Sequence, residues 1–165
     1  MESVGPWESV GGDIKFLRLK QLAIGGLVTN GSVRDTDEVL SYGFPTFSHS
    51  VTAAQGPATM QPWACNDIIN MNGTVVRPGD AIVGDQDGVV VVPAKVAELV
   101  YGIAHAREEI EGIVKEELTA NPGPPGKFYP FMSGKIKAES PLGQLLATKG
   151  ITPANSNQFE GTANW

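Results

Sequence analysis

The 165-residue sequence predicts an α/β fold, and three segments support this prediction. Residues 13–23 place apolar side chains at helical spacing and lead directly into the apolar, β-branched run 24–29. Residues 66–93 consist of short β-rich runs joined by tight-turn sequences. Residues 94–118 carry an apolar stripe with helical periodicity, which predicts one long helix. Helices on either side of β-rich segments indicate mixed layers of helix and sheet.

The first third of the chain predicts a helix, a strand, a loop and a second, short helix. The helix covers residues 13–23, and the strand over residues 24–29 is expected to end at the turn pair Asn30-Gly31. Ser32 to Asp35 would then form a loop beyond that turn. Residues 37–42 predict a short helix that stops at Gly43, and residues 45–48 predict the start of another strand.

The β-rich region predicts three or four strands, with a tight turn at Asn72-Gly73. Four consecutive valines, residues 89–92, are closed by Pro93 and are expected to form a central strand that is buried on both faces. After Thr119 the sequence is rich in proline and glycine, which predicts an extended C-terminal tail. The expected organisation is a domain over residues 1–118 and a C-terminal extension over residues 119–165.

Composition and charge exclude several classes of function. The chain has 12 Lys and Arg against 18 Asp and Glu, and no basic cluster, so no nucleic-acid partner is expected. It has neither a signal-peptide pattern nor an apolar run of membrane-spanning length, which predicts a cytoplasmic protein with no membrane partner. The single cysteine, Cys65, excludes a disulfide within the chain.

Two short motifs are candidates for chemistry. Arg34-Asp35 follows a predicted strand, where functional loops commonly lie, although an exposed ion pair is an equally simple interpretation. Gly12-Asp13 stands at the start of a predicted helix, where free backbone N–H groups can bind a carboxylate. The alternative there is an ordinary N-cap aspartate. Spacing alone does not decide between these interpretations.

Four motifs taken together resemble one known family. They are GGLVTNGSVRD (25–35), GFPTF (43–47), RPGD (77–80) and GDQDGVVVVP (84–93). In order and spacing the chain resembles, over residues 12–118, the family of the regulator of ribonuclease activity A and the 4-hydroxy-4-methyl-2-oxoglutarate aldolases. The resemblance implies a β-rich, swivelling β/β/α sandwich-type domain with a long C-terminal helix. It also implies a homotrimer or homohexamer with active sites between subunits. Only eleven residues precede Gly12, so the N-terminal part of the family domain is expected to be missing.

The resemblance also implies roles for particular residues. Asp35 would bind Mg²⁺ or Mn²⁺ largely through water, Arg34 would donate to the keto oxygen of the substrate, and Asp13 would act through a water in proton transfer. Glu111 on the long helix, or Glu109 as the next choice, would reach the site of a neighbouring subunit. The substrate carboxylate would be bound at the start of the first helix, by Gly12, Ile14, Lys15 and Phe16.

The implied activity is that of a metal-dependent aldolase, a carbon–carbon lyase. It would cleave 4-hydroxy-2-oxo acids such as 4-hydroxy-4-methyl-2-oxoglutarate to pyruvate, and could decarboxylate oxaloacetate, because both reactions pass through the pyruvate enolate. Two alternatives stay open: a non-catalytic regulator with a ribonuclease partner, and a truncated, inactive paralogue. Asn30 stands where the family commonly has Asp, and Ile14-Lys15 replaces a small or apolar pair.

Overall fold

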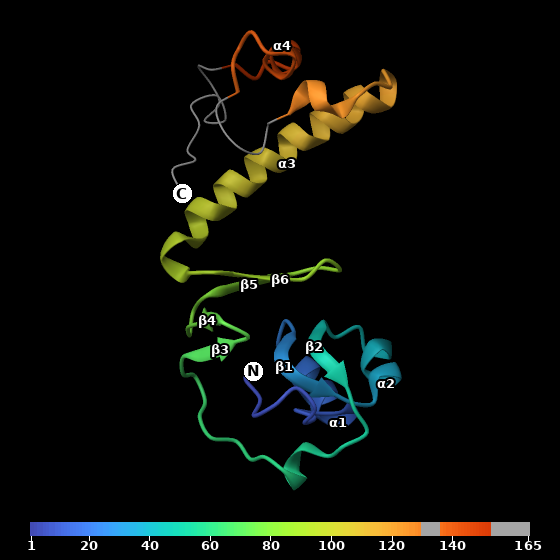
Figure 1. The fold of residues 1–165 in the computed structure, drawn as a ribbon, viewed down its shortest axis with the longest axis vertical. Helices are drawn as coiled ribbons and strands as arrows, with labels where there is room; N and C mark the ends of the chain where they lie inside the picture. The colour runs from blue at the N-terminus through green and yellow to red at the C-terminus, as the bar shows by residue number, and fades with distance from the viewer. Residues whose placement is uncertain (130–135, 153–165) are drawn as a thin grey trace. The chain divides into compact units, whose positions relative to one another are not determined.

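The computed structural model describes residues 1–129 and 136–152, which cluster into two compact units, Met1–Ala97 and Glu98–Trp165 (Figure 1). The first unit contains α1 (Asp13–Gln21), β1 (Leu27–Val33), α2 (Thr36–Ser41), β2 (Thr46–Val51), a 3₁₀ turn (Gly56–Ala58), β3 (Ile69–Met71), β4 (Thr74–Val76), β5 (Ala81–Gly84), β6 (Val89–Val92) and a second 3₁₀ turn (Ala94–Val96). The second unit contains most of α3 (Ala97–Ala120), a 3₁₀ turn (Pro125–Phe128) and α4 (Pro141–Thr148). The mixture of helix and strand confirms the predicted α/β class, whereas the sandwich arrangement and the boundary after residue 118 stay predictions.

The central sheet of the first unit is built from β1, β2 and the chain segment that precedes α1. β1 and β2 pair in parallel. On the other side of β1, the Ser32 N–H donates to the Glu8 carbonyl at 3.0 Å and the Val10 N–H donates to the Ser32 carbonyl at 2.9 Å. The fully buried Ser32 hydroxyl bonds to the Pro6 carbonyl and to the Ser50 hydroxyl, at 2.6 Å each. These bonds hold three separate chain segments side by side.

The predicted turn at Asn30-Gly31 is wrong, because both residues belong to β1. The pairing of β1 with β2 shifts register between Thr29 and Ser32, so the irregularity that the Asn-Gly pair suggested is absorbed within the strand. The Asn30 side chain accepts a hydrogen bond from the Ser3 N–H at 2.7 Å, and the Gly31 N–H donates to the Thr29 hydroxyl at 3.0 Å. The strand therefore runs on and delivers Arg34 and Asp35 directly at its end.

A small apolar core joins α1 and α2 to this sheet. Phe16 of α1 is fully buried, and its ring stacks on that of Phe44, with ring centroids 6.2 Å apart. The other buried members are Val10, Val33 and Val39, contributed by the N-terminal segment, β1 and α2. Figure 1 shows the two helices beside β1 and β2. This core fixes the start of α1 relative to the end of β1.

Three or four strands were predicted in residues 66–93, and four are present, as two antiparallel hairpins, β3–β4 and β5–β6. The predicted turn at Asn72-Gly73 is confirmed between β3 and β4. The expectation that residues 89–92 form a central strand buried on both faces is wrong. Within the described residues β6 pairs with β5 alone, and the Val90 side chain is 61% exposed. Apolar composition indicated full burial, but Val90 is exposed and the other three valines are only half-buried.

The RPGD motif forms the tight turn that leads into β5. Asp80 closes it, because one carboxylate oxygen accepts the Arg77 N–H at 2.8 Å and the other accepts the Ala94 N–H at 3.1 Å. Hydrogen bonds from these two backbone groups hold the pKa of the Asp80 carboxyl below its ordinary value. Asp80 is therefore a turn-forming residue that also ties the start of β5 to the segment after β6.

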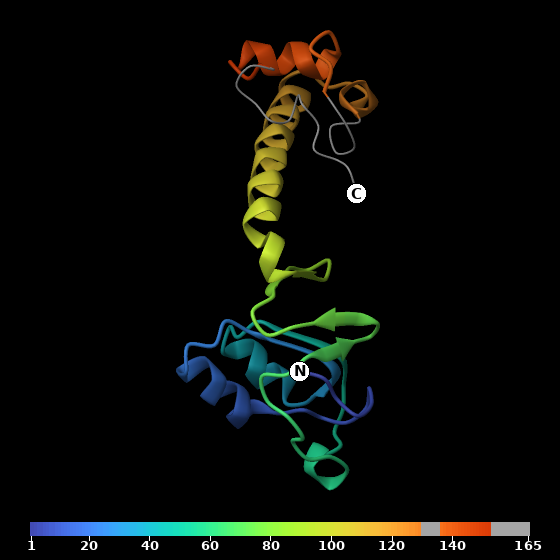
Figure 2. The ribbon, with the colours of Figure 1, turned by 90° about the vertical axis from the view of Figure 1, so that its left-hand side faces the viewer.

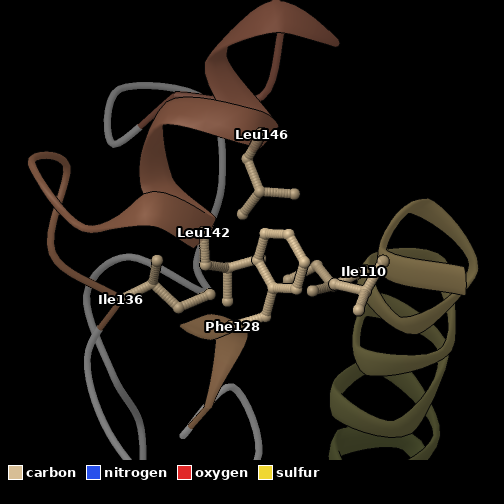
Figure 3. Close-up of a cluster of buried hydrophobic side chains, with 6 residues drawn as sticks. Ile110, Phe128, Ile136, Leu142 and Leu146 are labelled. Carbon is tan, nitrogen blue, oxygen red and sulfur yellow. The ribbon is translucent and has the colours of Figure 1, made fainter. Parts of the chain in front are cut away.

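The second unit has its own core of buried side chains around the C-terminal half of α3. Figure 2 shows α4 beside that end of α3. The predicted long helix is confirmed, with its regular part at Ala97–Ala120. The ring of Phe128 lies among Ile110 from α3 and Leu142 and Leu146 from α4 (Figure 3). Leu146 is fully buried, and Ile110 is 2% exposed.

The expectation of an extended tail is wrong for the part of the C-terminal segment that the structure describes. Proline enters helices readily at the first turn, and Pro141 begins α4 directly after Ser140, whose hydroxyl accepts the Gly143 N–H at 3.0 Å. The predicted loose tail after residue 150 lies almost entirely outside the described residues. None of the helices in residues 1–129 and 136–152 is long and apolar enough to cross a membrane.

Candidate functional site

Asp35 stands at the junction of β1 and α2 in a left-handed backbone conformation, with φ 58° and ψ 41°. Aspartate is one of the few residues other than glycine that adopt this conformation routinely. Although Asp35 is the N-cap residue of α2, its side chain does not cap that helix. Its Oδ2 atom accepts the Asp13 N–H, at 3.2 Å, instead. The carboxylate is therefore directed at the start of α1.

A backbone hydrogen bond brings the two candidate motifs together. The Arg34 N–H donates to the Gly11 carbonyl at 3.2 Å, which continues the parallel pairing of the N-terminal segment with β1. Gly12-Asp13 and Arg34-Asp35, 22 positions apart in the sequence, consequently lie against each other. The sequence placed both motifs at ends of elements, but only this pairing makes them one site.

Gly12 is required at this junction because of space. Its φ of −133° and ψ of −165° are open to any residue. A Cβ atom at this position would overlap Oδ2 of Asp35 and would lie 3.0 Å from Nε of Arg34. The absence of a side chain thus lets the Asp35 carboxylate reach the first N–H of α1.

The charges at the site are loosely paired and partly exposed. Nε of Arg34 and Oδ2 of Asp35 are 3.6 Å apart, and both side chains are a little over one-third exposed. That distance is too long for a hydrogen bond, so the pair adds little to stability and leaves the guanidinium able to bind another group.

Tyr42, at the end of α2, has a pKa that is affected by the charges of the site. Burial raises the pKa of its hydroxyl, and the negative charges of Asp13, Glu38 and Asp35 raise it further. Both candidate aspartates therefore lie close enough to Tyr42 to act on its hydroxyl electrostatically. Sequence reasoning missed Tyr42, because no motif or periodicity marks its proximity to these carboxylates.

The start of α1 only partly matches the expected carboxylate cradle. Gly12, not Asp13, is the N-cap residue, and no side chain caps the helix, so the interpretation of Asp13 as an ordinary N-cap is wrong. The Phe16 N–H already donates to the Gly12 carbonyl at 3.2 Å. Ile14 and Lys15 lie in the first turn, where amides have no acceptor within the helix. Fewer backbone N–H groups are therefore available to bind a substrate carboxylate than the sequence predicted. The Asp13 N–H is not available either, because it donates to Asp35.

Glu111 and Glu109 lie on α3 in the second unit, and their predicted roles stay predictions. Glu111 pairs with Lys115 one turn along, at 2.7 Å, and this hydrogen bond raises the pKa of the Lys115 ammonium. Glu109 lies 3.7 Å from His105. Each pair joins two residues one turn apart on α3, a common arrangement on helix surfaces.

The donor set suits a hydrated divalent ion. Within residues 1–129 and 136–152, no group of three or more His, Cys, Asp or Glu side chains could hold a metal. A site supplied wholly by protein ligands is therefore not present in this part of the chain. Mg²⁺, however, commonly keeps several waters and takes one or two carboxylates. Among the described residues, both contacts of Asp35 fall on Oδ2 and none falls on Oδ1, the oxygen that such an ion would use.

A cavity of the first unit, with a volume of about 1320 Å³, lies elsewhere. Its walls come from the first halves of β1 and β2 and from the two hairpins, and they include none of the predicted site residues. Its titratable wall groups are His49 and the terminal amine of Met1. The charged groups that could perform chemistry are gathered at Asp13, Arg34 and Asp35 instead.

Comparison with known proteins identifies the family. The model of the RraA-like family, described as Aldolase/RraA, matches residues 5–91, which is more than half of the chain. The chain belongs to this family. The resemblance inferred from the motifs is thereby confirmed. The matched residues of this RraA-like chain include Asp13, Arg34 and Asp35, whereas Glu111 lies beyond them.

Two curated proteins are similar in sequence to this RraA-like chain. One, from Halalkalibacterium halodurans, bears the name "Putative 4-hydroxy-4-methyl-2-oxoglutarate aldolase"; it is 38% identical over 85 residues, 52% of this chain and 40% of the relative. The other, an uncharacterized protein of Methanocaldococcus jannaschii, is 30% identical over 115 residues, 69% of this chain and 55% of the relative. The chain thus spans about half the length of these curated relatives.

Solved structures share the fold. An uncharacterized protein from Pseudomonas syringae pv. tomato matches 74% of this chain and 62% of its own, with a TM-score of 0.69 and 30% identity. Streptomyces coelicolor RraAS2, described as an unusual member of the RNase ES inhibitor RraA protein family, matches 70% of this chain and 58% of its own. Its TM-score is 0.58 and its identity 27%. Similar proteins therefore include both aldolase-named and ribonuclease-inhibitor-named members.

Proposed function

We propose that the chain carries a divalent-metal-dependent lyase site that cleaves 4-hydroxy-2-oxo acids, of the 4-hydroxy-4-methyl-2-oxoglutarate type, to pyruvate. One observation carries the proposal: the Asp35 carboxylate lies 3.2 Å from the first N–H of α1 and beside the Arg34 guanidinium, with Gly12 leaving the space between them. The name of the relative from Halalkalibacterium halodurans supports the same activity.

Each residue would have a distinct task. Asp35 would hold Mg²⁺ or Mn²⁺ through its open oxygen, with water completing the coordination; the ion, when bound, supplies Lewis-acid polarisation of the substrate. The amides of Ile14 and Lys15 would bind the carboxylate of the pyruvate unit at the positive end of α1. Arg34, always protonated, would donate to the keto oxygen as negative charge develops there.

Proton removal completes the reaction. Asp13 lies on the first turn of α1, and its carboxylate would position a water that takes the proton from the 4-hydroxyl group, so that the bond between the third and fourth carbons can break. Glu111 of a neighbouring subunit would assist, in a homotrimer or homohexamer. Oxaloacetate decarboxylation requires no such proton removal, so it would depend on Arg34 and Asp35 more than on Asp13.

The decisive experiment measures pyruvate release from 4-hydroxy-4-methyl-2-oxoglutarate and from oxaloacetate, in Mg²⁺ and in EDTA. Asp35→Asn should lower the Mg²⁺-dependent rate by about a hundredfold or more, the usual effect of removing a key electrostatic group. Asp37→Asn, two residues further along on the exposed part of α2, is the matched control and should retain the wild-type rate. Equal rates for wild type and Asp35→Asn would contradict the proposal.

A ribonuclease regulator is the second candidate, favoured by the structural likeness to RraAS2. In that case the chain would bind a ribonuclease and slow its cleavage of RNA, without turning over an oxo acid. The two functions separate experimentally, because Asp35→Asn should abolish pyruvate release but leave inhibition of a ribonuclease intact. A folded chain that inhibits RNA cleavage and releases no pyruvate would favour the regulator over the lyase.

A further inference from the structure

The chain contains two Asn-Gly pairs, Asn30-Gly31 and Asn72-Gly73, which the structure places in opposite environments. In this dipeptide the backbone nitrogen of glycine can attack the side-chain amide carbon of asparagine. A carbon–nitrogen bond forms, ammonia leaves, and the resulting succinimide is opened by water to aspartate or isoaspartate. We propose that Asn72 is a site of this modification in the folded protein and that Asn30 is protected from it.

Asn72 and Gly73 form the two-residue turn between β3 and β4. Both have positive φ, 53° and 94°, as the tightest hairpin turns require. Both residues are exposed, and a Cβ added at Gly73 would meet nothing within 4 Å. The turn therefore has room for the glycine nitrogen and the asparagine side chain to move toward each other.

The hairpin that carries this turn is short. β3 and β4 have three residues each, and they pair with each other alone among the described strands. A two-stranded hairpin of this size is marginally stable, so it opens at low free-energy cost. Opening releases the turn from its closed geometry and lets the nitrogen reach the side-chain carbon.

One side chain restrains the attacking nitrogen. The Gly73 N–H donates to Oδ1 of Asn70 at 2.6 Å, and the nitrogen must lose that proton before it can attack. Asn70 is thus a restraint on the reaction, and its removal should accelerate modification at Asn72.

The Asn30-Gly31 pair lacks this freedom to move. Gly31 is buried inside β1, its N–H donates to the Thr29 hydroxyl, and a Cβ there would lie 2.6 Å from Cβ of Ser3. The Asn30 side chain accepts the Ser3 N–H at 2.7 Å, so its carbonyl oxygen is held in place. Reaction there requires β1 to leave the sheet.

Modification at Asn72 would change the wall of the large cavity, because Met71, Asn72 and Thr74 all line it. Aspartate tolerates the left-handed conformation, so that product keeps the hairpin and adds one negative charge. Isoaspartate inserts an extra carbon into the main chain. The closing pair Met71–Thr74 could then no longer be bridged by a two-residue turn.

The test is peptide mapping by mass spectrometry of the full chain after incubation at pH 8 and 37 °C. In native buffer, Asn72 should convert at least about tenfold faster than Asn30. This ratio corresponds to a free energy of local opening that is lower by about 1.4 kcal/mol for the β3–β4 hairpin than for β1. In concentrated urea both should convert at similar rates. Equal native rates, or faster conversion of Asn30, would overturn the proposal, as would an Asn72 that is stable in native buffer but reacts in urea.

Asn70→Ala provides the second arm. It should raise the native rate at Asn72 about fivefold, the population change expected for one net hydrogen bond, and leave the rate at Asn30 unchanged. The Asn30 rate also serves as the folding control, because a variant that unfolds would accelerate both positions. An unchanged or slower rate at Asn72 would refute the role assigned to Asn70.

Discussion

Replacing Gly12 by alanine tests how the site is assembled. The added Cβ would overlap Oδ2 of Asp35, and the Asp35 side chain, which is flexible at its far end, would move away. The hydrogen bond from the Asp13 N–H is already 3.2 Å long, so a shift of a few tenths of an ångström breaks it. We expect the fold to survive and the site to be lost.

The size of the stability change follows from what is broken. One exposed hydrogen bond at a helix N-terminus contributes about 1 kcal/mol, and the backbone of Gly12 accommodates alanine without strain. Gly12→Ala should therefore lower the free energy of unfolding by about 1 kcal/mol, measured by urea denaturation. If the lyase proposal holds, Mg²⁺-dependent pyruvate release should fall by about a hundredfold or more, because the Asp35 carboxylate and Arg34 guanidinium are both displaced.

Gly25→Ala is the matched control. It lies in the same unit, and its added Cβ would meet nothing within 4 Å. Its unfolding free energy should stay within about 0.5 kcal/mol of wild type, as for ordinary surface changes, with unchanged activity. A Gly12→Ala variant indistinguishable from this control in both measurements would refute the argument that the missing side chain assembles the site.

Three further predictions concern the two units. Phe16→Ala, which empties a fully buried position, should destabilise the first unit by about 3–5 kcal/mol in urea denaturation; a cost below about 1 kcal/mol would mean that Phe16 does not anchor α1. Ser140→Ala should lower the stability of the second unit by about 1 kcal/mol through loss of the α4 cap, whereas Ser140→Asp should retain most of it. Asp80 has a lowered pKa in the folded state, caused by hydrogen bonds from the Arg77 and Ala94 N–H groups. Its stabilisation is therefore fully present above its ordinary pKa of 3.8 and is lost as the pH falls through the lower folded value. Urea midpoints measured below about pH 5 should thus fall less steeply for Asp80→Asn than for wild type, and parallel curves would contradict this assignment.

Local sequence signals predicted most elements of the fold. Helical periodicity located α1 and α3, and turn sequences between short β-rich runs located the short strands. Both signals depend on neighbouring residues only. The same local logic failed at Asn30-Gly31. There the turn propensity of the pair was outweighed by pairing of β1 on both sides, a contact with residues far away in the sequence.

Burial was harder to predict than secondary structure. Residues 89–92 are as apolar as any central strand, yet within the described residues β6 has one partner, because apolar composition does not specify what covers a strand. α4 was missed for the opposite reason. Its proline-rich surroundings indicated an extended tail, whereas Pro141 at the first turn and the Ser140 cap start a helix that is stabilised by burying Leu142 and Leu146.

For the candidate site, the sequence by itself determined the chemical groups: a glycine and an aspartate at the start of one helix, and an arginine and an aspartate after a strand. It also determined the family through the order and spacing of its motifs. Only the tertiary structure decided that these groups meet, because the hydrogen bond from the Arg34 N–H to the Gly11 carbonyl joins residues 23 positions apart. It also decided that Asp35 turns toward α1 rather than α2, since Gly12 leaves space that only a residue without a side chain provides.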